Sequence, residues 1–267
     1  MSASQLKTYI ERLQVGEPDE EIVPEGFGID TEGPVAAPLE YVDVDTLPTG
    51  IVTGSNLIAF DPATPNVIRS SVALSLLAAQ RVATKDGGIT TPKQWLDKHN
   101  EVLTNLNWVG DGGAVVESTL KGNNVAVHQA ILPLLTAAFG PAIAAGAIIL
   151  TALKQLQEMD KGSSWITLFD RQSRHFDVTE YQFSAVDIQD GQAVLRIASA
   201  RFNAAFGHTQ VLFFRLKQEN VQFESASGTF RTDTALLQGI NGDLKAKLLG
   251  FSKAFIAKLP DDLGVDQ

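Results

Sequence analysis

The 267-residue sequence predicts an α+β fold in which helix hairpins flank an antiparallel β-sheet, giving three layers. Apolar residues recur at helical spacing in several segments after Pro65. The spacing becomes strand-like after Gly162, and helical spacing returns from Thr234 to Leu259. The composition is that of an ordinary globular chain, with 44% hydrophobic and 19% charged residues, which excludes a wholly disordered or coiled-coil protein.

Almost all of the net charge of −10 lies in the first fifty residues. They carry eleven acidic and two basic side chains, whereas the other 217 residues carry 20 and 19. Five prolines in the same stretch keep the backbone extended. We therefore predict an acidic, proline-rich arm, which is either an ordinary solubilising segment or a removable cover over an apolar surface.

The arm is expected to occupy residues 1–60, followed by one domain over residues 61–260 and a tail over residues 261–267. Near its start, apolar side chains at helical spacing predict one short amphipathic helix that docks on the domain, namely Leu6, Tyr9, Ile10 and Leu13. The N-terminal residues lack a basic segment followed by an apolar core. We therefore expect the protein to be made in the cytoplasm without a signal peptide, and any release to use another route.

Two helices are predicted at the start of the domain. The first begins at Pro65 and stops at Gly87, and the second begins with Thr91 as its N-cap and Pro92 in its first turn. A short strand around residues 114–120 follows.

The stretch from Gly122 to Leu153 contains no charged residue. Its length and apolarity reach the threshold of ~20 residues for a membrane span, but Pro133 and the Gly140–Pro141 pair interrupt it. We therefore predict two apolar helices in a hairpin over residues 123–158. Helices that are apolar on nearly all sides are either deeply buried or directed to a membrane, and both alternatives stay open.

Five strands are predicted after Gly162 from their alternating or continuously apolar sequences: Trp165–Phe169, Val178–Val186, Ala193–Phe202, Gln210–Lys217 and Val221–Phe230. Residues 211–216 are apolar on both faces, which places them at the centre of the sheet. A final helical segment over residues 234–259 is expected to cover it.

The sequence excludes several classes of chemistry. Without cysteine the chain has no thiolate metal site, thioester or cysteine nucleophile, and its four widely spaced histidines form no helical metal pair. The Gly110-Asp-Gly-Gly segment lacks the pattern of a dinucleotide loop, and no phosphate loop or nucleophile–base pair is present. The acidic net charge disfavours nucleic acid. We therefore expect no enzyme, no metal and no nucleic-acid partner.

Four short strings, taken in order, resemble the Cyt family of cytolytic insecticidal δ-endotoxins. The resemblance covers about Pro65 to Leu244. The strings are Pro65-Asn66, Asn123-Asn124, Trp165-Ile166-Thr-Leu-Phe169 after Lys161-Gly, and Gln210-Val-Leu-Phe-Phe214. A distant branch of the same fold contains the Evf insect-gut virulence factor, which carries a fatty acyl chain on a cysteine. The resemblance implies a Cyt-like α/β sandwich, insecticidal or pore-forming activity at membranes, and a protoxin trimmed at its ends.

We therefore expect a virulence factor or toxin that perturbs target-cell membranes through the apolar hairpin and the amphipathic strands. Its expected partner is the membrane lipid of a target cell, with self-oligomerisation on membranes left open. The alternative is a non-covalent fatty-acid or lipid-binding protein with a pocket between helices and sheet. The residues expected to face lipid or line that pocket are Leu134, Ile143, Ile149, Trp165, Phe183, Leu195 and Phe213. Each of these could equally belong to an ordinary hydrophobic core.

Overall fold

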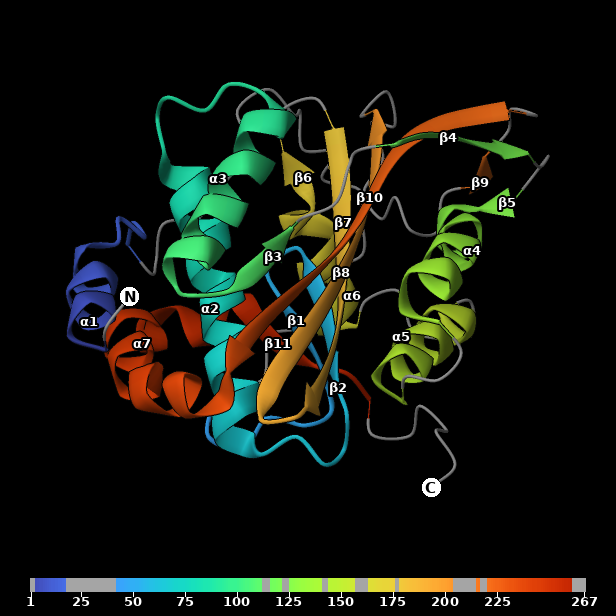
Figure 1. The fold of residues 1–267 in the computed structure, drawn as a ribbon. Coiled ribbons are helices and arrows are strands. Elements are labelled where there is room, and N and C mark those ends of the chain that lie inside the picture. Colours follow the sequence, from blue (N-terminus) through green and yellow to red (C-terminus); the bar gives the residue numbers. More distant parts are fainter. Residues whose placement is uncertain are drawn as a thin grey trace.

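The structure is a computed structural model, and it describes most of the chain. The described residues are 3–17, 42–111, 116–121, 125–140, 144–156, 163–175, 178–203, 215–216 and 220–260. They form three layers, in which a sheet separates two groups of helices (Figure 1). The predicted three-layer α+β fold is therefore confirmed.

The described residues contain seven helices. Their bounds are α1 Ala3–Arg12, α2 Asn66–Lys85, α3 Pro92–Asn105, α4 Val127–Phe139, α5 Ala144–Gln155, α6 Ser164–Gln172 and α7 Thr234–Phe255. The same residues contain eleven strands. These are β1 Gly50–Thr53, β2 Asn56–Phe60, β3 Val109–Asp111, β4 Val116–Lys121, β5 Val125–Ala126, β6 Arg174–His175, β7 Val178–Gln189, β8 Gln192–Asn203, β9 Arg215–Leu216, β10 Asn220–Asp233 and β11 Ile256–Lys258.

Nine of the described strands form the main sheet, in the order β11-β1-β2-β7-β8-β10-β3, with β4 paired to β10 and β6 to β7. Every pair is antiparallel except β2 and β7, which run parallel. These two strands are far apart in the sequence, so the connection is long enough for a parallel crossover. The β7–β8 hairpin turns through Asp190 and Gly191, whose positive φ angles of 49° and 76° suit a tight two-residue turn.

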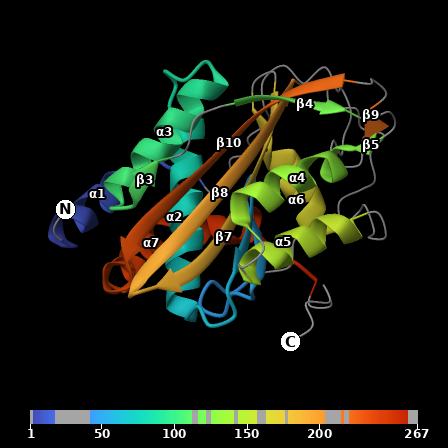
Figure 2. The same cartoon turned by 45° about the vertical axis from the view of Figure 1, so that its right-hand side comes forward.

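The pleat of the sheet divides the interior into two cores. On β7, Val186 faces a first core shared with α1, α2, α3 and α7, whereas Tyr181, Phe183 and Ala185 face a second core shared with α4, α5 and α6. Figure 2 shows the two groups of helices on opposite sides of the long strands β7, β8 and β10.

Helices α3 and α7 begin where the sequence predicts, and each has a side chain that caps its N-terminus. Thr91 and Gln94 form a capping box at α3, in which the Thr91 hydroxyl accepts the Gln94 N–H at 3.3 Å and the Gln94 side chain accepts the Thr91 N–H at 3.1 Å. Asp233 caps α7 by accepting the Leu236 N–H at 3.0 Å. The hairpin is present as α4 and α5, although Pro133 lies inside α4 without ending it.

One predicted strand is a helix. Residues 164–172 form α6, because Trp165, Ile166, Leu168 and Phe169 lie on a single helical face that is buried in the second core. The same run of aromatic and β-branched residues has high strand propensity, but tertiary packing overrides it.

The predicted central strand lies mostly outside the described residues. Residues 211–214 lie outside the described part, and Arg215–Leu216 form β9, which pairs with β5 in a separate two-stranded sheet. In the main sheet, β8 is the strand flanked on both sides by long partners, β7 and β10.

Both ends of the segment predicted as an arm, residues 1–60, are part of the folded domain. Residues 50–60 form β1 and β2 within the main sheet rather than belonging to the arm. The predicted amphipathic helix is α1, and its side chains Leu6 and Ile10, together with Leu13 directly after the helix, are buried in the first core. Removing residues 1–50 would therefore remove core side chains as well as acidic charge.

Candidate functional site

The hairpin of α4 and α5 covers one half of the sheet. Its inner face packs on β2, β7 and β8 and is fully buried in the second core. The buried side chains on this face are Val127, Ile131, Leu135, Phe139, Ile148, Ile149, Ala152 and Leu153. Gly146 permits close contact between the two helices, because a Cβ added there would lie 3.0 Å from the Cβ of Phe139.

The outer face of the hairpin carries almost no charge. No residue of α4 is charged, and Lys154 is the one charged residue of α5. Exposed or half-buried positions on this face are Pro133, Leu134, Ala137, Ala144, Ala147 and Leu150. By contrast, α3 on the opposite layer carries ion pairs such as Lys93–Asp97 at 2.7 Å. The hairpin is therefore apolar toward the sheet and, apart from Lys154, uncharged toward solvent.

Four of the predicted lipid-facing residues lie in or beside the second core. Ile149, Trp165 and Phe183 are buried there, and Leu134 is half-buried and packs against it. Trp165 arrives from α6 rather than from a strand. These four residues share one layer of the molecule, where their side chains also serve as ordinary core.

The other three predicted residues do not join them. Leu195 points to the opposite face of β8 and is buried in the first core, so its prediction as part of the same surface is wrong. The reason is the two-residue period of the strand, which sends Leu195 and its neighbour Ala198 to different sides. Ile143 and Phe213 lie outside the described residues.

Helix α6 is fastened to the sheet by a polar contact that the sequence analysis missed. The Tyr181 hydroxyl donates a hydrogen bond to the Asp170 carboxylate, which is only 3% exposed. Phe169 packs against Tyr181 and Phe183 with ring centroids 5.1 and 5.7 Å apart. Asp170 stands next to Arg171 in the sequence, and such a charged pair by itself indicates a solvated turn. Asp170 lies four residues after the buried Ile166 and therefore on the same face of α6, and only this spacing could have indicated that the Asp170 side chain points inward.

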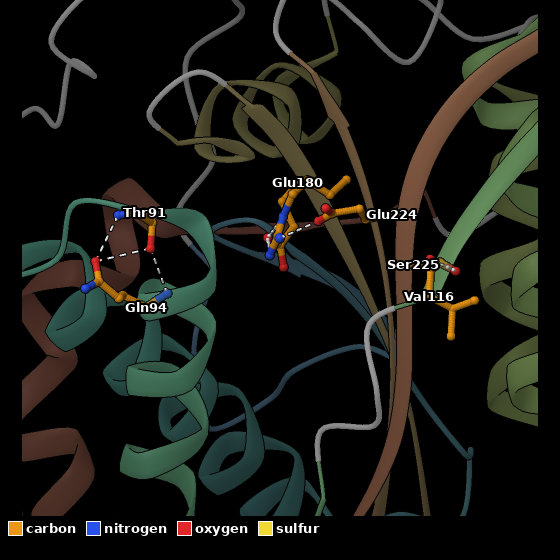
Figure 3. Close-up of polar contacts among 7 residues, drawn as sticks. Thr91, Gln94, Val116, Glu180, Glu224 and Ser225 are labelled. Carbon is orange, nitrogen blue, oxygen red and sulfur yellow. Dashed lines mark hydrogen bonds and ion pairs between the residues drawn. The ribbon is translucent and has the colours of Figure 1, made fainter.

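A ladder of charged side chains crosses three strands on the other face of the sheet (Figure 3). Arg201 donates from Nε and Nη2 to Glu180 Oε2 at 2.9 and 2.7 Å, and from Nη1 to Glu224 Oε2 at 2.7 Å. Glu180 and Glu224 lie directly opposite Arg201 in the strand register. Burial raises the pKa of the Glu180 carboxyl, and the adjacent Arg201 guanidinium opposes part of that rise.

A cavity of about 310 Å³ opens beside this ladder, between the first turn of α3 and the end of the sheet. Its lining combines both signs of charge with apolar groups, namely Thr91, Pro92, Lys93, Glu117, Val178, Arg201, Phe223 and Glu224. Figure 3 includes two residues of this lining, Thr91 at the capped start of α3 and Glu224 on β10. No residue of α4 or α5 lines it, so it is separate from the hairpin.

Two general features of the described residues bear on the site. No helix among them is both long enough and apolar enough to cross a membrane. Across the same ranges, no group of three or more histidine or acidic side chains converges in a way that could hold a metal ion.

Comparison with known proteins gives likeness in fold only. No family model matches the sequence, and no curated protein matches it. The fold is similar to that of a solved δ-endotoxin, with 12% identity and a TM-score of 0.39 over 75% of this chain and 90% of that chain. It is also similar to the structure of the Evf virulence factor, with 15% identity and a TM-score of 0.34 over 76% of this chain and 80% of that chain.

Proposed function

We propose that this protein is a toxin or virulence factor that perturbs target-cell membranes through the α4–α5 hairpin. One observation carries the proposal: the hairpin is apolar on the face that packs on the sheet and, apart from Lys154, uncharged on the face that meets solvent. An ordinary surface helix has a charged outer face, as α3 does.

The energetics favour a closed hairpin in water and a displaced one at a bilayer. Separating α4 and α5 from the sheet exposes apolar surface at ~25 cal/mol per Å² in water, whereas a lipid environment removes that cost. A charged side chain at the membrane centre costs about 2.5–3.5 kcal/mol, and the hairpin has only Lys154, near the end of α5. Its long side chain can extend to the headgroups.

The length of the helices favours a position in the membrane interface. At 1.5 Å per residue, a helix of 13 residues such as α4 is ~20 Å long, which is shorter than the ~30 Å hydrocarbon core. The proposal is therefore that the hairpin lies along the boundary between headgroups and acyl chains.

A charge scan on the outer face tests the proposal. Ala137→Lys and Ala147→Lys place an ammonium group on exposed positions of α4 and α5, so the soluble fold should tolerate them. We expect each to lower dye release from zwitterionic liposomes by about tenfold, because insertion must now desolvate a charge. The matched control is Ala246→Lys, an exposed position of α7 on the opposite layer, which should leave release unchanged. Equal release from all variants would contradict the role of the hairpin.

Carriage of a fatty acid or other lipid between hairpin and sheet is the alternative that follows from the sequence. Extraction of the purified protein followed by mass spectrometry decides it. A stoichiometric lipid, together with an absence of dye release from the wild-type chain, would replace membrane perturbation by carriage.

A further inference from the structure

One edge of the main sheet is open in the part of the chain that the structure describes. β3 and β4 both pair with the side of β10 that faces away from β8, and neither pairs with any other described strand. Figure 2 shows β4 at the outer margin of the sheet, with β10 between it and β8. An edge strand leaves a row of N–H and C=O groups unpaired, and such a row can pair with another strand.

The β4 edge is better able to accept a partner than the opposite edge. That opposite edge is β11, which is three residues long and is followed closely by Pro260. β4 has six residues and contains no proline. Val116 on β4 and Val109 on β3 are 56% and 70% exposed, and they are two of the four large apolar side chains exposed in the described ranges. Shortness and proline are common protections of sheet edges, and β4 has neither.

Glu117 on β4 lacks a counter-charge. In the register of β4 and β10 it lies directly opposite Glu224, and like charges at such positions repel each other. Glu224 is paired with Arg201 at 2.7 Å, whereas Glu117 is exposed and forms no ion pair with another described residue. A cation placed beside Glu117 from outside the sheet would therefore be favourable.

The sequence of β4 supplies that cation to a second copy of itself. Glu117 lies two residues before Thr119, and Lys121 lies two residues after it. When two copies of the strand pair antiparallel about Thr119, Glu117 of each copy lies opposite Lys121 of the other, and the two threonines lie opposite each other. Opposite charges and threonine pairs both stabilise antiparallel strands. Shifting this register by one residue removes both charge pairs.

We propose that two copies of this chain associate through their β4 edges, in an antiparallel pairing about Thr119. Each copy uses the same surface, so the interface is closed and association stops at a dimer. Paired residues point to the same face of a sheet, so the joined sheet carries both α4–α5 hairpins on one face. The pairing needs no bilayer, and it therefore stands independently of the proposed action of the hairpin.

Sedimentation velocity of the full chain tests the dimer. A six-residue ladder is a small interface, so we expect reversible association whose dimer fraction rises with protein concentration up to about 1 mM. Glu117→Lys creates like charges at both pairs and should weaken the association about tenfold, although it suits the monomer by facing Glu224. Lys121→Glu should do the same, and within the monomer it faces the uncharged Asn220. The matched control is Glu11→Lys on the exposed side of α1, which should leave the association unchanged.

Mixing the two variants separates loss of the interface from loss of the fold. In a mixed dimer, position 117 of each copy again faces the opposite charge at position 121 of the other. An equimolar mixture of Glu117→Lys and Lys121→Glu should therefore associate about as strongly as wild type, although neither variant does so alone. A wild-type chain that stays monomeric at the highest concentration, or a mixture that associates no better than its components, overturns the proposal.

A cysteine at the symmetry axis gives a second measurement that does not depend on charge. The chain has no cysteine, and directly opposite residues of antiparallel strands have Cβ atoms ~4.5–5.5 Å apart, which is near the separation of a disulfide. Mild oxidation of Thr119→Cys should give a covalent dimer about tenfold faster than oxidation of Ala246→Cys, an exposed position of α7. Equal rates at the two positions would place any contact between copies elsewhere and overturn the proposal. Both experiments are made in buffer, so their failure leaves the liposome results on the hairpin unaffected.

Discussion

At the scale of the residue, His99 shows how burial alone sets a protonation state. The side chain is fully buried on α3 and stacks on Trp95 with ring centroids 5.4 Å apart. Burial lowers the pKa of His99 from 6.5 to about 4, and a hydrogen bond with Asn100 opposes only part of that shift. The small cavity next to it is lined by Gln182, Ser199 and apolar side chains, so no carboxylate there compensates a positive charge.

This environment predicts a loss of stability in mild acid. Because the pKa of His99 is lower in the folded than in the unfolded chain, its contribution is complete above pH 6.5 and is lost as the pH falls toward 4. Between pH 7 and pH 5 the free energy of unfolding should fall by about 2 kcal/mol from this residue. Urea denaturation at the two pH values measures the change.

The control for that prediction is His99→Leu, which removes the titrating group but keeps an apolar side chain against Trp95. Glu180 acts in the opposite direction, because a raised carboxyl pKa contributes stability at low pH that is lost as the pH rises. The difference between wild type and His99→Leu therefore isolates the histidine. An equal pH dependence in both proteins would show that His99 is not responsible.

At the scale of the element, the hairpin depends on close contact between its two helices. Gly146 on α5 leaves room for Phe139 on α4, whereas Gly239 on α7 has no atom within 4 Å of where a Cβ would be. Both lie in helices, so replacement by alanine gains about 0.5–1 kcal/mol of helix propensity at either position. Only the first replacement also forces a contact of 3.0 Å with Phe139.

We therefore predict opposite signs for two alanine substitutions. Gly239→Ala should raise the Tm by a few degrees, and Gly146→Ala should lower it, because overpacking costs about 1–3 kcal/mol and outweighs the propensity. Calorimetric melting of both variants checks this. A rise in Tm for Gly146→Ala would mean that the two helices do not need their close approach.

The elements that the sequence predicted correctly are those with strong local signals. The capping box at Thr91, the stop at Gly140 and the long alternating strands β7 and β8 are all readable from residue type and period. The run Trp165–Phe169 could not be decided locally, because its side chains satisfy a strand by propensity and a helix by spacing. Only the second core, assembled from distant segments, selects the helix.

The candidate site was less predictable than the fold, because it too depends on contacts between segments that are distant in the sequence. Charge-free sequence located the hairpin, but it could not separate the two faces of the sheet, so Leu195 was placed with Phe183 although they face different cores. The two-residue turn at Asp190–Gly191 fixes the register that pairs Glu180 with Arg201, whereas the pairing of Arg201 with Glu224 depends on the register of β8 and β10, which no tight turn joins.

At the scale of the whole molecule, the two helical layers differ in chemistry. The layer of α1, α2, α3 and α7 carries surface ion pairs such as Lys7–Asp243, and Arg81 fastens the segment after α1 by donating to the Val15 carbonyl at 2.9 Å. Among the described residues of α4, α5 and α6, the charged side chains are Lys154 and, at the C-terminal end of α6, Asp170 and Arg171. We therefore expect the hairpin layer to move at a membrane while the other stays on the sheet.

The most direct test of this claim is a reversible covalent lock. The chain has no cysteine, so a single engineered pair reports without interference. A Cβ at Gly50 would lie 3.5 Å from Cγ2 of Ile148, which makes Gly50→Cys with Ile148→Cys a suitable pair for tying β1 to α5. Dye release from zwitterionic liposomes is then compared for the oxidised and the reduced form of the same protein.

We predict that the oxidised form releases little or no dye and that reduction restores release to the level of a Gly50→Cys single variant. Both forms carry the same substitutions, so a difference between them reports on hairpin movement alone. Equal release from the locked and unlocked forms would contradict the claim that the hairpin leaves the sheet.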